Sequence, residues 1–345
     1  MRSSDDPGFA QNSYVNNVTG RHDMTGYKKT TFALAIAAAT VIGGAVYAQQ
    51  KTMAIGTGGT GGVYYPLGGA IANVLSKNLP NTQATAEVTG GSVDNLKLIA
   101  SGQSEMGFSM ADAAQDALKG EDKFKGNKVP LQTLLVVYPN RMHVVTIEGA
   151  GIEKMSDLKG KRVSTGSPGG ATEVMAFRLI EAAGLDKDKD MKRERLGVAE
   201  SVNAIKDKKI DAFFWVGGIP TAAVTDLGAT PGLKMKLVDH SEAVAKMNDK
   251  YGKLYSEGMI KAGSYPGYDK DNKIAEVWNI IVTNDKMKDE DAYNIVKTLV
   301  EKKADIVAVH KEAESFSLDN QKQDRSPVPF HPGAMKYFKE KGVGG

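Results

Sequence analysis

The sequence predicts an α/β fold of two lobes around a ligand cleft. Strand-like and helix-like segments alternate along most of the chain, which is typical of sheets whose strands are mostly parallel. Glycine-rich turns follow several of the expected strands, and two long apolar segments stand where the chain could cross between lobes. With 345 residues, the chain is long enough for two domains of ordinary size.

The expected strands are short apolar or alternating runs, several of them bounded by glycine or proline. The run from residue 131 to 147 is too long for one ordinary strand, and Pro139-Asn140 is expected to break it. The strands are expected at 52–57, 82–89, 106–110, 131–147, 161–165, 191–196, 211–218, 235–240 and 275–285.

Helices are expected where apolar residues recur every three to four positions. The apolar positions that begin at Leu67, Ala70 and Ile71 follow this period. Pro220 is expected in the first turn of a helix after the strand at 211–218. The other helices are expected near 63–77, 92–100, 111–118, 171–184, 199–210, 241–251, 289–310 and 331–338, with an irregular tyrosine- and glycine-rich stretch at 251–272.

Two segments are expected to connect the lobes, one around Pro139 and one around Trp278–Val282. They would form a two-strand hinge, and a cleft hinged in this way can close on a small molecule. The predicted domains are therefore lobe I, made of 49–140 plus 281–345, and lobe II, made of 141–280.

The N-terminus has the layout of a secretory signal peptide. Lys28 and Lys29 precede an alanine-rich apolar run, which ends in a small-residue cleavage site at Ala48. The run is short and weakly apolar for a membrane anchor, so cleavage is favoured over anchoring. We expect a soluble, monomeric mature chain in the periplasm.

The first 23 residues are polar and unlike the start of a signal peptide. Our hypothesis is that translation begins at Met24 and that these residues reflect a misplaced gene start. Residues 1–48 are thus predicted to be an upstream extension followed by a cleaved signal peptide at 24–48.

Composition excludes several classes of protein. The 44 basic and 41 acidic residues are interspersed, and the net charge is only +3, which does not favour a nucleic-acid partner. Without cysteine the chain has no disulfide, thiolate metal site or cysteine nucleophile. The five histidines are scattered, and neither G-x-S-x-G nor H-E-x-x-H occurs. We therefore expect no catalytic residues, no metal and no cofactor.

The stretch AIGTGGTGGVYYP contains a G-x-G-x-x-G motif formed by Gly56, Gly58 and Gly61. Glu87 stands near the end of the second expected strand, where a dinucleotide site has its acidic residue. An exported protein meets no free pool of NAD, however, and Pro66 departs from the motif's usual continuation. A dinucleotide-dependent enzyme remains the less favoured alternative.

Four glycine turns follow expected strands and precede expected helices. In open α/β sheets ligands bind at this edge, and the N–H groups of helix N-termini attract anions. No turn has the Lys-Ser/Thr of a phosphate-binding P-loop. The turns are GTGGTGG (56–62), TGGS (89–92), GSPGG (166–170) and VGGIP (216–220).

Three single side chains are further candidates for the site. Arg141 could pair with a carboxylate of the ligand, or it could be a solvated surface arginine. Trp215 could form an aromatic wall, or it could belong to the core. Asp112 could bind an ammonium group, or it could be an acidic residue in the first turn of a helix.

Four segments resemble the TAXI family, the periplasmic substrate-binding subunits of a class of TRAP transporters. These segments are IGTGGTGGVYYPLGGAIANVL, VTGGSVDNLKLIASGQSEMGFS, DLKGKRVSTGSPGGATEV and HPGAMKYFKEKG. The resemblance implies a type II periplasmic-binding-protein fold and delivery of a small organic anion or amino acid to TRAP membrane permease subunits. The family's permeases use an ion gradient, and its known ligands include glutamate, glutamine and 2-oxoglutarate. A ligand-sensing subunit for a membrane kinase is the alternative.

The resemblance also implies a set of ligand-contacting residues. The family's usual second-lobe loop is G-x-P-G-S-G-T, whereas this chain has Gly170-Ala171 before Thr172, which removes a hydroxyl donor. The implied contacts are Gly58, Gly59, Thr60, Gly61, Tyr65, Gly91, Ser92, Ser109, Asp112, Thr165, Ser167, Gly170, Ala171, Thr172, Trp215, Gly217 and Gly218.

Overall fold

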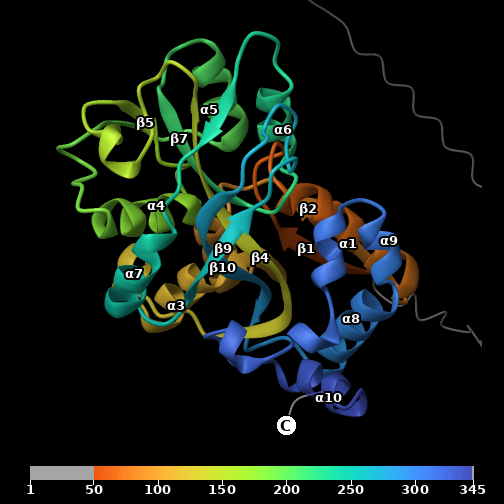
Figure 1. The fold of residues 1–345 in the computed structure, drawn as a ribbon. Coiled ribbons are helices and arrows are strands. Elements are labelled where there is room, and N and C mark those ends of the chain that lie inside the picture. The colour runs from red at the N-terminus through yellow and green to blue at the C-terminus, as the bar shows by residue number, and fades with distance from the viewer. Residues whose placement is uncertain (1–49, 344–345) are drawn as a thin grey trace, which may run out of the picture. The chain divides into compact units, whose positions relative to one another are not determined.

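The computed structural model describes residues 50–343, so the predicted signal peptide lies outside the described residues. The strands of this part of the chain are shown in Figure 1. They are β1 (Lys51–Gly56), β2 (Thr82–Glu87), β3 (Met106–Met110), β4 (Leu131–Ile147), β5 (Arg162–Ser164), β6 (Lys192–Glu194), β7 (Ala212–Gly217), β8 (Met235–Leu237), β9 (Tyr255–Ile260) and β10 (Asn272–Asn284).

The helices cover the sheet, and all but α2 are labelled in the same figure. They are α1 (Tyr64–Asn78), α2 (Ser92–Ser101), α3 (Ala111–Lys119), α4 (Ala171–Ala182), α5 (Val198–Lys206), α6 (Ala222–Gly228), α7 (Val244–Tyr251), α8 (Asp289–Glu301), α9 (Lys303–Val307) and α10 (Pro332–Glu340).

The sheet has parallel strands towards both ends and two long antiparallel strands in the middle. Its order is β2-β1-β3-β10-β4-β7-β5-β6, with β8 paired to β4 and β9 paired to β10. β1 is parallel to β2 and β3, and β5 is parallel to β6 and β7. The predicted α/β class is confirmed. We call β1–β3 with α1–α3 the β1 side, and β5–β7 with α4–α6 the β5 side.

Strand β4 runs without a break through Pro139-Asn140, so the predicted interruption is wrong. Pro139 pairs with Trp278 of β10, and Asn140 pairs with Val277. The register of β10 shifts between Trp278 and Ile280. Such an irregularity accommodates a proline, which has no N–H to donate to the ladder.

Three other expectations are corrected. The stretch at 251–272 is not irregular throughout, because it contains β9, which pairs with β10. The helix expected at 289–310 is divided into α8 and α9 at Lys302, whose ψ of 19° departs from helical geometry. Pro220 precedes α6, whose N-cap is Thr221.

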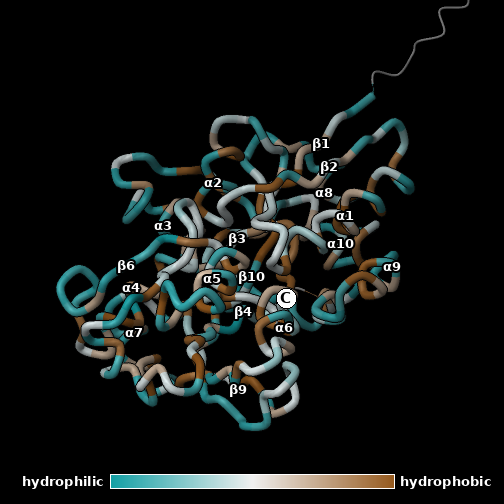
Figure 2. The backbone as a smooth tube through the Cα atoms, turned by 90° about the horizontal axis from the view of Figure 1, so that it is seen from above, coloured by the Kyte–Doolittle hydropathy of each residue, from teal (hydrophilic) through white to brown (hydrophobic). Residues whose placement is uncertain are grey.

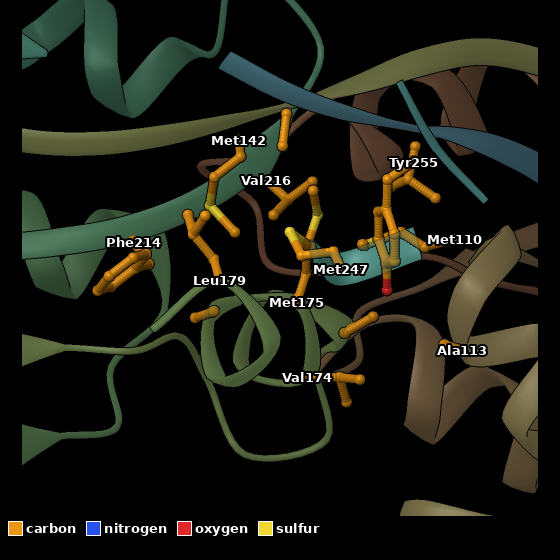
Figure 3. Close-up of a cluster of buried hydrophobic side chains, with 14 of the residues drawn as sticks. Met110, Ala113, Met142, Val174, Met175, Leu179, Phe214, Val216, Met247 and Tyr255 are labelled. Carbon is orange, nitrogen blue, oxygen red and sulfur yellow. The ribbon is translucent and has the colours of Figure 1, made fainter. Parts of the chain in front are cut away.

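One hydrophobic core is shared by the β1 side and the β5 side. Figure 3 shows Met110 and Ala113 at the start of α3 near Val174 and Met175 of α4. Further buried residues of β4, β7, α7 and β9 complete this cluster. Each side also has a separate buried cluster under its own helices. The shared core therefore holds α3 and α4 together.

Hydrophobic and hydrophilic residues are mixed along helix α7 (Figure 2), in which Val244 and Met247 are buried. This pattern is expected of helices that bury one face against a sheet. Within residues 50–343, no helix combines the length and the apolar character that crossing a membrane requires.

Candidate ligand-binding site

A cavity of about 310 Å³ lies between the β1 side and the β5 side. All four glycine turns predicted from the sequence border it, and a fifth turn at Gly197 joins them. The turns converge because each follows a parallel strand and the two groups of parallel strands run in opposite directions along β4 and β10, so that their carboxyl ends face each other across the cavity.

Four helices begin at this cavity. The first residues of α1, α2, α4 and α5 all border it, namely Tyr64, Ser92, Ala171 and Val198. At none of these four N-termini does a side chain accept a hydrogen bond as a cap. The first-turn N–H groups of a helix lack partners within the helix and carry partial positive charge. The cavity thus offers backbone donors from both sides of the sheet.

Side-chain charge contributes little to the cavity. Among the described residues that border it, the titratable side chains are Tyr64, Tyr138 and Glu200, and none is a lysine or arginine. Attraction of an anion would therefore come from the helix N-termini. The described residues also contain no group of three or more His, Asp or Glu side chains that could hold a metal ion.

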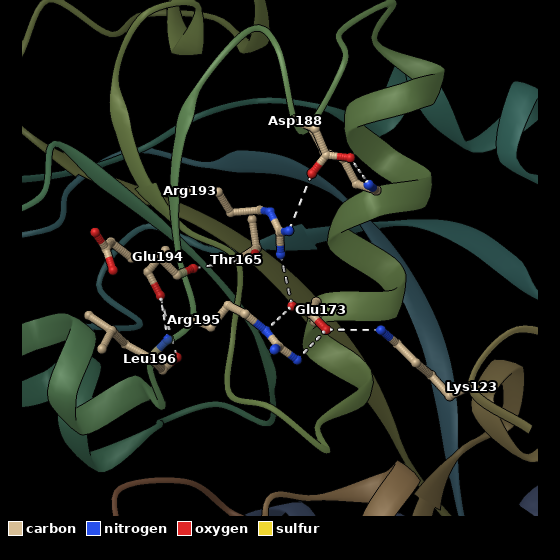
Figure 4. A network of polar contacts seen from close by, with 10 residues as sticks. Lys123, Thr165, Glu173, Asp188, Arg193, Glu194, Arg195 and Leu196 are labelled. Carbon is tan, nitrogen blue, oxygen red and sulfur yellow. Dashed lines mark hydrogen bonds and ion pairs between the residues drawn. The ribbon is translucent and has the colours of Figure 1, made fainter.

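The N-terminus of α4 is fixed by a network of charges (Figure 4). Glu173, in the first turn, is 1% exposed and pairs with Arg193, Arg195 and Lys123. The bond from Lys123 Nζ to Glu173 Oε2 measures 3.1 Å and comes from the loop that follows α3. This network anchors the turn that contains Thr172 next to the cavity.

Three hydrogen bonds join the two sides around the cavity. Ser167 Oγ donates to the Gly90 carbonyl at 2.9 Å, and the Asp94 N–H donates to the Gly169 carbonyl at 3.0 Å. The Ala223 N–H donates to the Gly61 carbonyl at 3.2 Å. The glycine turns therefore contact one another directly, and the cavity is closed along these edges.

Glycine is required where the two sides touch. A Cβ on Gly90 would lie 2.4 Å from the carbonyl oxygen of Pro168, and a Cβ on Gly61 would lie 3.0 Å from the Cβ of Ala199. Real Cβ atoms essentially never show the distance at Gly90, and the distance at Gly61 is tighter than nine in ten real Cβ contacts. These glycines therefore have two roles. They allow the chain to turn, and they allow the β1 side and the β5 side to approach each other closely.

A buried ionic cluster links α3 to α4 away from the cavity. Arg178 of α4 contacts Asp116 at 2.5 Å and Asp112 at 3.6 Å. The hydroxyl of Tyr255 donates to Asp112 Oδ2 at 2.8 Å. Burial raises the pKa of Asp116 to about 6. The positive charge of Arg178 lowers this pKa, and the nearby Asp112 carboxylate raises it further.

The floor of the cavity is polar. The Tyr64 hydroxyl donates to Asn279 Oδ1, which also accepts from Asn140 Nδ2 at 2.8 Å. Tyr64 stacks on Phe108 with 4.9 Å between ring centroids. Burial raises the pKa of Tyr64 and that of Tyr138, so both remain protonated phenols at neutral pH.

Most of the site residues expected from the sequence border the cavity. Trp215 also contacts the opposite side, because its ring fills the space beside Gly62. Its Nε1 donates to Thr221 Oγ1 at 2.9 Å, which fixes the ring. The expected residues at the cavity are Gly58, Gly59, Thr60, Gly61, Gly91, Ser92, Ser167, Gly170, Ala171, Thr172, Trp215 and Gly217.

Two expected residues have other partners instead. Arg141 pairs with Glu312 at 2.6 Å and with Glu276 at 3.3 Å, so the carboxylates it binds are the protein's own. Asp112 belongs to the buried cluster with Arg178.

The other four also lie outside the cavity lining. Ser109 Oγ donates to the Met110 carbonyl at 2.9 Å, and Thr165 Oγ1 donates to the Glu194 carbonyl at 3.4 Å. Gly218 lies against Tyr138. Tyr65 is 36% exposed, and its neighbour Tyr64 borders the cavity in its place.

Some residues at the cavity were not expected from the sequence. Gly197 follows a strand and precedes a helix, so it repeats the pattern of the four predicted turns and could have been found by it. Tyr138 and Asn140 flank Pro139, where the sequence analysis placed only a break. The lining residues that belong neither to the predicted turns nor to the other expected contacts are Val63, Tyr64, Val88, Met110, Tyr138, Asn140, Gly197, Val198, Ala199 and Glu200.

Solved structures with a similar fold are periplasmic proteins and transporter components. A structure described as a periplasmic transporter aligns with a TM-score of 0.51 at 13% identity, covering 84% of this chain and 92% of that chain. A putative L-cystine ABC transporter from Listeria monocytogenes gives 0.47 at 15% identity, with 77% and 95% covered. The periplasmic aliphatic sulphonate binding protein of Escherichia coli gives 0.40 at 14% identity, with 84% and 83% covered.

The chain thus has the mixed α/β fold of periplasmic solute-binding proteins, in which two groups of strands flank a cavity. The model of the NMT1-like family matches residues 55–342, which include the glycine turns, the central strands and the C-terminal helices. The chain therefore belongs to the NMT1-like family.

Proposed function

We propose that this chain is the periplasmic solute-binding subunit of a TAXI-type TRAP transporter. It captures a small carboxylate solute of the glutamate, glutamine or 2-oxoglutarate class and delivers it to an ion-gradient-driven permease. The observation that carries the proposal is the convergence of four helix N-termini without side-chain caps on one cavity. The resemblance of the glycine turns to the TAXI family supports it.

The proposed mechanism is a shift of population towards the closed arrangement. A carboxylate in the cavity accepts N–H bonds from α1 or α2 on the β1 side and from α4 or α5 on the β5 side. Only contacts made to both sides together favour closing, because a ligand shifts an equilibrium only by its difference in affinity for the two states. The permease then recognises the closed form.

We place the hinge in β4 and β10, the two long strands that pair with each other. β10 also pairs with β3 on the β1 side, and β4 also pairs with β7 on the β5 side. On this proposal lobe I comprises 49–140 plus 281–345, and lobe II comprises 141–280. Bending of the two strands near Pro139 and Ile280 would separate the glycine turns and open the cavity.

The dinucleotide alternative has less support. Glu87, the acid that would bind the ribose, does not border the cavity, and its Oε1 accepts a hydrogen bond from Thr85 at 2.9 Å. Gly61, the third glycine of the motif, faces the protein's own side chains. A Cβ on Gly61 would lie 3.0 Å from the Cβ of Ala199 and 3.3 Å from the Cβ of Ala223, both on the β5 side.

A screen of thermal unfolding tests the proposed function. The chain beginning at Gln49 is heated with organic acids, amino acids and NAD, and a ligand that binds the folded state is expected to raise its Tm. We expect carboxylates to give the largest increase and NAD to give none. An increase with NAD alone would favour the enzyme, and no increase with any carboxylate would refute the transport proposal.

A further inference from the structure

Two polar atoms beside the cavity have no hydrogen-bond partner among the described residues. They are Tyr138 Oη and Asn140 Oδ1. Both side chains belong to β4, both border the cavity, and they are 0% and 2% exposed. Buried polar atoms in folded proteins are almost always paired, so each orphan needs an explanation. Because both residues border the cavity, a molecule bound there can supply the missing partners.

The hydrogen-bonding role of each atom follows from its neighbours. Asn279 Oδ1 accepts from the Tyr64 hydroxyl and from Asn140 Nδ2, and this bond orients the Asn140 amide so that its oxygen is left without a partner. Asn279 Nδ2 is also without a partner among the described residues, but Asn279 does not border the cavity. Burial keeps the Tyr138 phenol protonated, so it has a proton to donate. The pair thus presents one donor and one acceptor.

Few functional groups satisfy such a pair. An ammonium group only donates, and a carboxylate or ketone only accepts, whereas a hydroxyl or carboxamide does both. We propose that the solute carries, in addition to its carboxylate, a hydroxyl or carboxamide that accepts from Tyr138 Oη and donates to Asn140 Oδ1. This inference rests on the proposed function and narrows its ligand class. It favours glutamine over glutamate and a 2-hydroxy acid over a 2-oxo acid.

Titration calorimetry with matched solutes tests the inference. The pairs are L-glutamine against L-glutamate, and L-2-hydroxyglutarate against 2-oxoglutarate and glutarate. The wild-type chain is expected to bind the carboxamide or hydroxyl member of at least one pair about tenfold more tightly. The Tyr138→Phe variant removes the donor, and we expect it to lose this preference while the weaker member binds as before. Tyr65→Phe, at a tyrosine outside the cavity, is the control and is expected to keep the preference.

The outcomes separate the inference from the proposed function. If carboxylates bind but the wild type shows no preference in either pair, the inference is wrong and the proposed function stands. The same holds if Tyr138→Phe keeps the full preference. If none of the carboxylates binds, the proposed function fails and the inference fails with it. The wild-type comparison remains decisive even if Tyr138→Phe does not fold.

Discussion

The N–H of Asp94 donates to the carbonyl of Gly169 at 3.0 Å, which joins α2 on the β1 side to the turn before α4 on the β5 side. A Cβ on Gly169 would lie 2.2 Å from a carboxylate oxygen of Asp94, and the φ of Gly169 is 79°. The same carboxylate accepts from the Gly90 N–H at 3.1 Å. Glycine at this position therefore permits the two sides to meet.

The Gly169→Ala variant is expected to bind its ligand at least tenfold more weakly. The added methyl group displaces the Asp94 carboxylate and holds the two sides apart, which disfavours the closed state. The strained backbone lowers the free energy of unfolding by about 1 kcal/mol. Calorimetry and urea unfolding measure the two effects.

Gly184→Ala is the matched control. Its φ of 78° imposes the same backbone strain, but no atom lies within 4 Å of the added Cβ. We expect the same loss of stability with unchanged affinity. Equal affinities for the two variants would mean that contact between the turns does not contribute to binding.

Trp215→Ala and Thr172→Val are expected to weaken ligand binding without unfolding the protein. Both residues border the cavity, and the Trp215 ring spans it to Gly62. Tyr293→Ala is the control and is expected to keep wild-type affinity, because Tyr293 packs against Tyr337 of α10 and does not border the cavity. If both cavity variants kept wild-type affinity in calorimetry, the site would be misplaced.

Arg178→Met is expected to lower the free energy of unfolding by about 3–5 kcal/mol, because it leaves two buried carboxyl groups without their cation. Arg162→Met provides the comparison. Its pair with Asp211 is partly exposed, and its loss is expected to cost about 1 kcal/mol or less. Urea unfolding distinguishes them, and similar losses would show that the buried cluster contributes no more than a surface pair.

His143 is expected to make stability depend on pH. Burial lowers its pKa from 6.5 to about 3, and its ring is held by the Arg141 carbonyl and the Tyr265 hydroxyl. The unfolded chain binds the proton more readily, so stability from this residue is complete above pH 6.5. It falls by up to ~1.4 kcal/mol per pH unit as the pH drops towards 3.

Replacement by glutamine removes the titrating group. The free energy of unfolding of His143→Gln, measured in urea between pH 7 and 4, is expected to fall less steeply than that of the wild type. His240, whose pKa is lowered to about 4 by burial, contributes in the same direction and remains in both proteins. Parallel pH profiles would show that His143 is not buried as a neutral ring.

Helices, strands and turns could be predicted from the sequence where a local residue pattern determines them. The turns at 56–62 and 166–170 carry their own signal, since glycine next to a helix start is a local feature. Strand β9 was missed because its residues, Tyr255–Ile260, become a strand only by pairing with β10. Continuity of β4 through Pro139 depends in the same way on a register shift in its partner strand.

The site was predictable in its backbone and less so in its side chains. Glycine turns mark the carboxyl ends of the parallel strands, and the four predicted turns border the cavity. Arg141 could not be assigned from the sequence, because its partners Glu276 and Glu312 are more than a hundred residues away in the chain. Tyr138 was missed because a buried hydroxyl without a partner can be recognised only in three dimensions.

The most direct test of a carboxylate held by helix N-termini is calorimetric titration of the chain beginning at Gln49. L-glutamine is compared with its methyl ester, and L-glutamate and 2-oxoglutarate are compared with their dimethyl esters. We predict that at least one acid binds with a Kd in the micromolar range or below, and that its ester, which lacks the carboxylate charge, binds at least a hundredfold more weakly. Equal affinity for acid and ester, or no binding by any of the acids, would contradict the proposed site.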